Sequence, residues 1–210
     1  MPYLEKRQLF PGLIQFLENK RAQGAGRPPD FGQIINVLEE FDLLPAIFFL
    51  KSRSECDAAL KSCFGSAAGS KDASFDSDLE GLLSRYPYLR NHKQLHYLER
   101  AQVATHHGGQ LPAWKFFVET LMKMGKLRAI FATSTVAAGV NYPARTIVLF
   151  NSDLFNGNDF SPLSSTEFHQ MTGRAGRRGR DNIGFMLAVP GRFMDLQHLK
   201  KLFFKKPDAI

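Results

Sequence analysis

The chain has 210 residues, of which 44% are hydrophobic, and this composition supports a buried core and excludes a disordered polypeptide. Lysine and arginine number 27 against 20 acidic residues, and the formal charge of +7 favours a polyanionic partner. No run reaches the ~18 apolar residues that a membrane-spanning helix needs. The first residues also lack a signal-peptide core. The sequence therefore predicts an intracellular, cytoplasmic protein, or a nuclear one in a eukaryote, without membrane contact.

The two cysteines and a histidine pair bear on disulfides and metals. On one helix, Cys56 and Cys63 would lie about 10 Å apart along the axis, beyond the reach of a disulfide, so we expect two free thiols. His92 and His96 have i, i+4 spacing. Lys93 stands where a zinc-protease motif has glutamate, so a surface helix is favoured over a metal site. We expect no metal site.

Residues 1–43 are predicted to form a lead-in segment whose second half is a helix that packs on the domain. Residues 23–29 have the glycines and prolines of a loop. Asp30 and Gln33 then have the spacing of a capping box, and Pro45 is expected to end the helix. The apolar positions with helical spacing are Ile34, Ile35, Leu38 and Phe41.

Apolar runs that alternate with helical segments predict a parallel, doubly wound α/β sheet. The first run, 46–50, is continuously apolar, as expected for a parallel strand covered on both faces. The other predicted strands are 103–105, 127–132, 145–150 and 183–189. The predicted helices are 53–64 with Ser52 as cap, 78–84, 91–100, 111–124 with Phe117, Leu121 and Met124 inward, and one that begins after Ser164 with Glu167 at its third position.

Two further segments complete the outline. Residues 65–77 are rich in Gly, Ser, Ala and Asp and are predicted to form a surface loop. Residues 65–71 superficially resemble a phosphate-binding loop, but their spacing is wrong and they follow a helix rather than a strand. Residues 191–210 are predicted to form a basic amphipathic helix, with Phe193, Leu196 and Leu199 inward, that leads to a missing following domain.

Polar groups follow the predicted strands where such sheets bind ligands, at the carboxyl ends of the strands. Ser52 and Arg53 follow the first strand and suit contacts to phosphates; the alternative is a helix cap and a solvent-exposed arginine. Residues 133–144 offer hydroxyl groups at a strand-to-helix switch, which can present a helix N-terminus to an anion. Their alternative is ordinary capping followed by a proline turn.

Residues 170–181 read Gln-Met-Thr-Gly-Arg-Ala-Gly-Arg-Arg-Gly-Arg-Asp. Glycine costs about 1 kcal/mol in a helix interior, so composition alone does not place a helix here. Arg174 and Arg177, at i and i+3, would project from one helical face, and guanidinium groups suit phosphate oxygens. The stretch predicts a phosphate-binding edge, which we expect on the same side of the sheet as the other polar groups. A generic basic patch on a solvated loop is the alternative.

Four segments in order resemble motifs of the second RecA-like domain of superfamily 2 DExH-box helicases. The resemblance covers roughly 44–190 and is closest to the superkiller-like group, which includes RNA-exosome helicases and related DNA helicases. The segments are 49–53 (motif IV), 106–112 (His-His-x-Gly-x-Leu-Pro), 133–144 (motif V) and 170–181 (motif VI, the most specific). The resemblance implies a three-layer α/β RecA-like domain, with a mostly parallel sheet of five or more strands and helices on both faces.

The resemblance also implies a composite ATPase, in which ATP with Mg²⁺ binds between two RecA-like domains. Arg174 and Arg177 match the arginine fingers, which stabilise charge during phosphoryl transfer. Gln170 matches the residue that helps to hold the γ-phosphate and the attacking water. Nucleotide-proximal positions are Gly139, Asn141 and Gly173. Nucleic-acid-binding positions are Ser52, Arg53, His107, Gly108, Thr133 and Thr135. Coordinates that show both side chains turned inward and locked in internal ion pairs beneath the surface would contradict this interpretation.

The chain contains neither Gly-x-x-x-x-Gly-Lys-Ser/Thr nor Asp-Glu-x-His, which in the family belong to the first domain and hold the phosphates and Mg²⁺. We therefore expect half of a helicase: a lead-in at 1–43, the RecA-like domain at 44–190, and a basic helix at 191–210. Its expected partners are single-stranded nucleic acid, with RNA favoured over DNA, and the first RecA-like domain of the same full-length protein. The fragment alone is expected to be monomeric and inactive.

The alternative function is a catalytically inactive nucleic-acid or protein-binding module with the same fold. Retention of Gln170, Arg174 and Arg177 favours the helicase, because binding to a nucleic-acid backbone does not require the spacing of arginine fingers. A Rossmann enzyme is disfavoured, since no Gly-x-Gly-x-x-Gly follows a strand and opens a helix.

Overall fold

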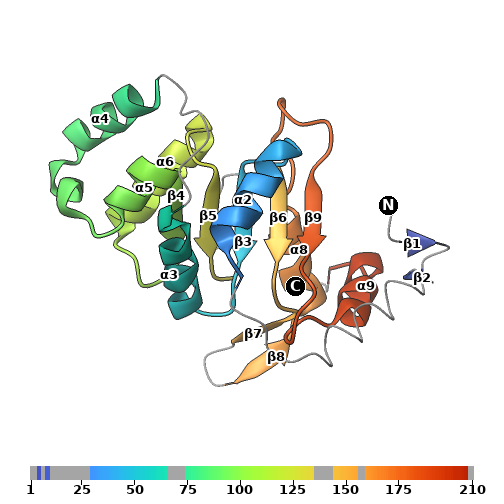
Figure 1. Ribbon diagram of the computed structural model, residues 1–210. Helices are drawn as coiled ribbons and strands as arrows, with labels where there is room; N and C mark the ends of the chain where they lie inside the picture. Colours follow the sequence, from blue (N-terminus) through green and yellow to red (C-terminus); the bar gives the residue numbers. More distant parts are fainter. Residues whose placement is uncertain are drawn as a thin grey trace.

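The computed structural model describes residues 4–5, 8–9, 29–65, 74–134, 144–155 and 159–207. Its centre is a five-stranded parallel sheet with the strand order β4-β5-β3-β6-β9 (Figure 1). The strands are β3 (Ala46–Phe49), β4 (Val103–His106), β5 (Ala129–Ala132), β6 (Thr146–Leu149) and β9 (Phe185–Ala188). They lie within or beside the five predicted runs, and the predicted α/β RecA-like fold is confirmed.

The strands end at one level. Phe49, the last residue of β3, lies opposite Ala132 of β5 and Leu149 of β6. His106, the last residue of β4, also lies opposite Ala132. The segments that follow β3, β4, β5 and β6 therefore leave the sheet along the same edge.

One face of the sheet is covered by α2 (Phe31–Glu40) and α3 (Arg53–Ser62). Phe48 and Phe131 point to this face, where the Phe31 ring lies 5.9 and 5.2 Å from theirs in edge-on contacts. Such aromatic pairs combine a large buried area with favourable ring geometry. Asp30 caps α2 by accepting the N–H of Gln33 at 3.1 Å, as predicted. Helix α2 is thus anchored to the domain at its N-terminal end.

The other face is covered by the remaining helices. Ile47 and Phe49 point to this side and share one core with Trp114 and Phe117 of α6. The helices that contribute to this core are α4 (Phe75–Arg85), α5 (Leu95–Ala101), α6 (Pro112–Met124), α8 (Ser165–Thr172) and α9 (Leu196–Phe204). The successive residues of β3 therefore face opposite layers, which confirms helices on both faces.

Several predicted boundaries were wrong. Helix α2 ends at Glu40, so Phe41 follows its last turn and is 71% exposed rather than buried. Helix α4 begins at Phe75, inside the predicted loop 65–77. Met124 is exposed, because α6 ends beside Gly125, whose φ of +76° breaks the helix. Phe193 is also exposed, since α9 begins only at Leu196.

The predicted helix 91–100 is divided. A 3₁₀ turn, η2 (Pro87–Asn91), precedes α5, so His92 lies outside the helix that contains His96. A second 3₁₀ turn, η1 (Cys63–Gly65), follows α3. Cys56 and Cys63 are both buried free thiols, as expected, and burial raises the pKa of Cys63 to about 12.

Two short antiparallel pairs were missed. They are β1 (Leu4–Glu5) with β2 (Gln8–Leu9), and β7 (Asp153–Phe155) with β8 (Phe160–Pro162). Strands of two or three residues are too short to show an alternating pattern, so hydrophobic periodicity does not reveal them. Among the described helices, none combines the length and apolar character needed to cross a bilayer.

Candidate functional site

Ser52 and Arg53 leave β3 at the carboxyl edge of the sheet. The Ser52 hydroxyl caps α3 by accepting the N–H of Glu55 at 3.1 Å. The Glu55 carboxylate in turn accepts the N–H of Lys51 at 3.0 Å. These bonds fix the turn between β3 and α3. Ser52 therefore acts as a helix cap, which was the alternative to a phosphate contact in the sequence analysis. Arg53, the first residue of α3, is exposed.

The loop after β4 lies against Arg53. A Cβ atom built on Gly108 would lie 3.2 Å from Nη2 of Arg53, so the guanidinium rests over this glycine. The next residue, Gly109, donates its N–H to Nδ1 of His107 at 3.1 Å. The structure therefore brings Arg53, His107 and Gly108 together from two strands, as the sequence predicted.

A buried polar network supports this loop from below. The amides of Gln94 and Gln110 donate to the Thr105 hydroxyl at 2.7 and 2.8 Å. Nε2 of His107 lies 3.5 Å from the Asp57 carboxylate. Burial nevertheless lowers the pKa of His107, so the ring is neutral near pH 7, with its hydrogen on Nε2 because Nδ1 accepts a bond. Sequence reasoning missed Gln94 and Gln110, whose burial no local pattern indicated.

Two other predicted positions belong to the segment after β5. Thr133 directly follows the strand and is half-buried at the same edge. Thr135 lies outside the described residues, as do Gly139 and Asn141. Strand β5 ends at Ala132 on the carboxyl edge, and β6 begins at Thr146 on the amino edge.

The arginine stretch lies at the opposite edge of the sheet. Ala144, which precedes β6, pairs with Ala175 in a parallel bridge. Its N–H donates to the carbonyl of Arg174 at 3.0 Å, and its carbonyl accepts the N–H of Gly176 at 2.7 Å. These bonds hold the segment beside the amino ends of β6 and β9. The expectation that all the polar groups share one edge was therefore wrong.

Helix α8 explains this reversal. It begins at the carboxyl side, where Ser164 and Glu167 form the predicted capping box, and it carries the chain back along the sheet. The helix ends at Thr172 with Gly173 as its cap. Arg174 and Arg177 follow the helix rather than lying on one of its faces, so the argument from helical i, i+3 spacing was wrong. Polar groups gather at the carboxyl ends of the strands only where a segment directly follows a strand. The arginine stretch follows a helix instead, so it lies at the other edge.

Glycines allow this segment to fold tightly. Gly176 has φ +88°, a region that side chains disfavour. A Cβ atom on Gly184 would lie 2.4 Å from the carbonyl carbon of Ala175. The backbones at 175–176 and 184 thus approach so closely that only glycine fits, which explains part of the glycine content of the segment.

Arg177 forms a two-point ion pair with Asp181. Its Nε and Nη2 donate to the two carboxylate oxygens, each at 2.8 Å, and its backbone N–H also donates to Oδ2 at 2.9 Å. The Asp181 side chain is only 2% exposed, whereas that of Arg177 is 21% exposed. These bonds lower the pKa of Asp181 to about 2. Arg177 is therefore internally paired, contrary to expectation, but it still reaches the surface.

The other residues of this edge differ in exposure. Arg174 is half-buried, while Gln170 and Gly173 are exposed. Arg178 and Arg180 are also exposed. Within the described ranges, no group of three or more His, Cys, Asp and Glu side chains could hold a metal ion.

Comparisons with known proteins agree with this architecture. The helicase conserved C-terminal domain matches residues 83–179. The chain is 38% identical over 190 residues to the probable helicase HelY of Mycobacterium tuberculosis, covering 80% of this chain and 20% of that protein. It is 35% identical over 179 residues to the chloroplastic DExH-box ATP-dependent RNA helicase DExH15 of Arabidopsis thaliana, covering 84% and 15%.

The human exosome RNA helicase MTR4 is 34% identical over 196 residues, covering 90% of this chain and 19% of MTR4. The chain thus spans a fifth or less of the length of these curated relatives. The matched domain and the named relatives are those of helicases, the class of protein that the four segments resemble. The chain therefore belongs to the superfamily 2 DExH-box helicases of the superkiller-like group, of which it carries the C-terminal, second RecA-like domain.

Proposed function

We propose that the chain is the second RecA-like half of an ATP-dependent nucleic-acid helicase that acts on single-stranded RNA. In this proposal it supplies arginine fingers to ATP bound on a first RecA-like domain, which holds most of the contacts to Mg²⁺. Two relatives carry "RNA helicase" in their names, which favours RNA over DNA. Alone, the chain is expected to be a monomer that hydrolyses ATP poorly.

The observation that carries the proposal is the division of polar groups between two edges of one sheet. Arg53, His107 and Gly108 meet at the carboxyl edge, where exposed guanidinium and backbone groups suit a phosphate backbone. Arg174 and Arg177 lie at the amino edge. A motor that couples hydrolysis to movement along a strand needs both surfaces, whereas a simple binding module needs only the first.

At the carboxyl edge, we assign backbone contacts to the residues that follow the strands. Arg53 supplies charge, and the exposed Gly108 lets a phosphate approach the loop closely. The hydroxyl of Ser52 already accepts a backbone hydrogen bond, but it can still donate its own hydrogen to a phosphate oxygen. The full set proposed for this surface is Ser52, Arg53, His107, Gly108, Thr133 and Thr135.

At the amino edge, Arg174 and Arg177 are the proposed fingers, and Gln170 the proposed partner of the γ-phosphate and attacking water. Asp181 binds Nε and Nη2 of Arg177, which leaves Nη1 without a hydrogen bond in the described part of the chain. An oriented guanidinium loses less side-chain freedom when it meets the charge of a transferring phosphoryl group. Gly139, Asn141 and Gly173 are the proposed nucleotide-proximal positions.

The test is RNA-stimulated ATP hydrolysis by the full-length protein that supplies the first domain. Arg174→Ala and Arg177→Ala are each expected to lower kcat on the order of 10³-fold, with RNA affinity unchanged. Arg85→Ala, at an exposed arginine in the last turn of α4, is the matched control. Equal turnover by the wild type and both finger variants would reject the finger assignment.

The nucleic-acid surface is tested separately with the present chain. Its affinity for single-stranded RNA is expected to fall steeply with salt, and Arg53→Ala is expected to reduce the slope of log K against log salt by about one. Binding that is insensitive to both salt and Arg53→Ala would reject the carboxyl edge as the RNA surface.

A further inference from the structure

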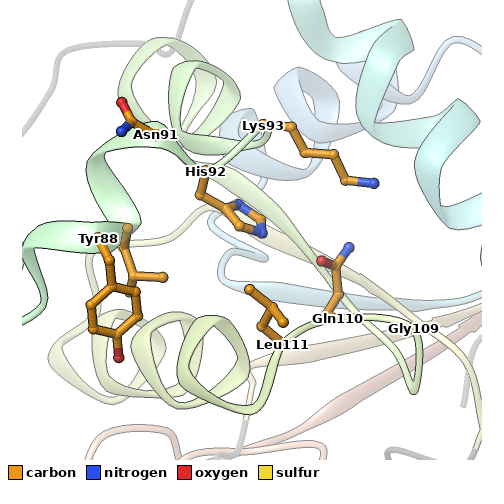
Figure 2. Close-up of a pocket in the computed structure, with 8 residues that line it drawn as sticks. Tyr88, Asn91, His92, Lys93, Gly109, Gln110 and Leu111 are labelled. Atoms are coloured by element: carbon orange, nitrogen blue, oxygen red, sulfur yellow. The ribbon is translucent and has the colours of Figure 1, made fainter.

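A pocket of about 320 Å³ lies beside the loop that follows β4. It is formed between η2 with the residues that follow it and the segment that leads into α6 (Figure 2). Its lining residues are Tyr88, Leu89, Asn91, His92, Lys93, Gly109, Gln110 and Leu111. Figure 2 shows His92, Gln110 and Leu111 converging on its centre, while the Asn91 side chain points away.

One wall of the pocket is an exposed aromatic ring on a fixed support. Tyr88 is 60% exposed. Its ring meets Tyr86 edge-on, with centroids 6.3 Å apart, and Tyr86 meets Phe116 of α6 in the same way at 6.2 Å. A rigid, solvent-facing aromatic ring can stack with another ring at little cost in side-chain entropy.

A second aromatic group, His92, closes the inner side. Its ring stacks on Trp114 with centroids 3.7 Å apart and planes 17° apart, and Trp114 stacks on Phe117. Trp114 is fully buried and does not line the pocket, so His92 is the exposed end of this aromatic column. Burial lowers the pKa of His92 and the nearby Lys93 lowers it further, so the ring is neutral at pH 7.

Hydrogen-bonding groups stand beside these rings. The Gln94 N–H donates to Nδ1 of His92 at 3.3 Å, so the neutral ring carries its hydrogen on Nε2 as a donor. The Gln110 amide is held in place through its nitrogen, which bonds Thr105. Lys93 is exposed, and Figure 2 shows its side chain extending on the side of Gln110, away from Tyr88. The pocket thus combines flat apolar surfaces with fixed polar groups and a positive charge.

The pocket is continuous with the Arg53 surface. Gly109 and Gln110 line it, and they directly follow Gly108, over which the Arg53 guanidinium lies. A strand whose phosphates lie along Arg53 and Gly108 would therefore pass at the mouth of the pocket.

We propose that this pocket is a base-binding subsite, which takes one unpaired nucleobase of the bound strand against the rings of Tyr88 and His92. This inference rests on the proposed function, since it assumes a single strand along the carboxyl edge. Lys93 neutralises an adjacent phosphate, and Nε2 of His92 and the amide of Gln110 contact the edge of the base. Polar groups of this kind accept more than one base, so little sequence preference is expected.

The test compares binding of the chain to a short oligouridine RNA and to the same backbone with abasic riboses. Tyr88→Ala is expected to weaken oligouridine binding about five-fold or more and to leave binding of the abasic strand unchanged. Tyr88→Phe keeps the ring and is expected to bind like the wild type. Phe41→Ala removes an aromatic ring of similar exposure far from the pocket, after the end of α2, and is the control.

Photocrosslinking gives an independent readout. When iodouridine-substituted RNA bound to the chain is irradiated, the RNA is expected to become attached to the peptide that contains Tyr88. If Tyr88→Ala binds oligouridine like the wild type while Arg53→Ala binds weakly, the base subsite is refuted and the RNA surface stands. If Arg53→Ala also binds like the wild type and binding does not depend on salt, the carboxyl edge fails as the RNA surface as well. Equal weakening with the abasic strand would show a merely structural effect and overturn the inference.

Discussion

Arg177 and Asp181 form an ion pair within one turn of chain, with both carboxylate oxygens accepting from the guanidinium and one of them also accepting the backbone N–H of Arg177. The pair closes the arginine segment on itself. It also fixes the direction of a guanidinium that would otherwise sample many rotamers. The segment itself is held at the sheet by the hydrogen bonds of Ala144 with Arg174 and Gly176, and Ala175 packs against the hydrophobic core.

Asp181→Asn is expected to lower the free energy of unfolding by about 1–3 kcal/mol, because it removes the charge-assisted bonds to Arg177. The pKa of Asp181 is lowered from 3.8 to about 2 in the folded state. This contribution is therefore fully present above about pH 4 and disappears as the pH falls through about 2. Urea denaturation across this range measures it, and the difference between wild type and Asp181→Asn should vanish at the acid end.

The same measurement has a control in Glu40→Gln, at an exposed carboxylate that is the last residue of α2. A stability difference between wild type and Asp181→Asn that stays constant down to the lowest pH would contradict the ion pair as its source.

Ser52 offers a way to separate capping from RNA binding. Ser52→Ala removes the acceptor for the Glu55 N–H and is expected to cost about 1 kcal/mol of stability. Ser52→Asp keeps a capping acceptor and adds favourable charge at a helix N-terminus, so its melting temperature should stay near that of the wild type. Its negative charge repels phosphate, however, and RNA affinity should fall below that of Ser52→Ala. Thermal melts and RNA titrations of both variants would decide between the two roles. Equal RNA affinity of Ser52→Asp and Ser52→Ala would show that Ser52 is not part of the RNA-binding surface.

The sequence predicted the central sheet well because parallel strands buried on both faces carry long apolar runs. Phe48 and Phe49 face opposite layers, and both are buried. Because both faces need apolar residues, no polar residue interrupts the run and the strand is recognisable in the sequence. The caps at Asp30, Ser52 and Ser164 were equally visible, since each places an oxygen three residues before the N–H that it accepts.

The features that the sequence did not predict depend on contacts between distant residues. The Gln94–Thr105 and Gln110–Thr105 bonds join separate elements, so no local pattern indicates them. The edge on which Arg177 lies depends on how α8 crosses the sheet, which periodicity within the arginine stretch cannot reveal. The shared edge of Arg53 and Gly108 was predictable, because both follow strands of one parallel sheet.

Lys51 joins the end of β3 to the β7–β8 hairpin. Its ammonium lies 2.8 Å from the Asp153 carboxylate and 4.0 and 3.9 Å from the ring centroids of Phe160 and Phe193. The side chain is only 11% exposed, so Lys51→Met is expected to cost about 2 kcal/mol. Lys61→Met, at an exposed lysine of α3, should cost little. In a double-mutant cycle, Asp153→Asn should cost less in the Lys51→Met background than in the wild type; strict additivity would contradict the interaction.

Replacement by alanine is expected to change stability in opposite directions at Gly184 and Gly81. A side chain at Gly184 would meet backbone atoms of Ala175 and Gly176 at 2.4 to 2.6 Å, so Gly184→Ala is expected to lower stability by about 1–3 kcal/mol. Gly81 lies inside α4 with no atom within 4 Å of a built Cβ, so Gly81→Ala is expected to raise stability by about 0.5–1 kcal/mol. Differential scanning calorimetry should therefore show melting temperatures on either side of that of the wild type.

Because Gly184 supports only the amino edge, Gly184→Ala should reduce ATP hydrolysis by the full-length protein. It should leave the RNA affinity of the chain intact at temperatures where the variant is folded. Loss of RNA affinity in folded Gly184→Ala would show that the two edges are not independent.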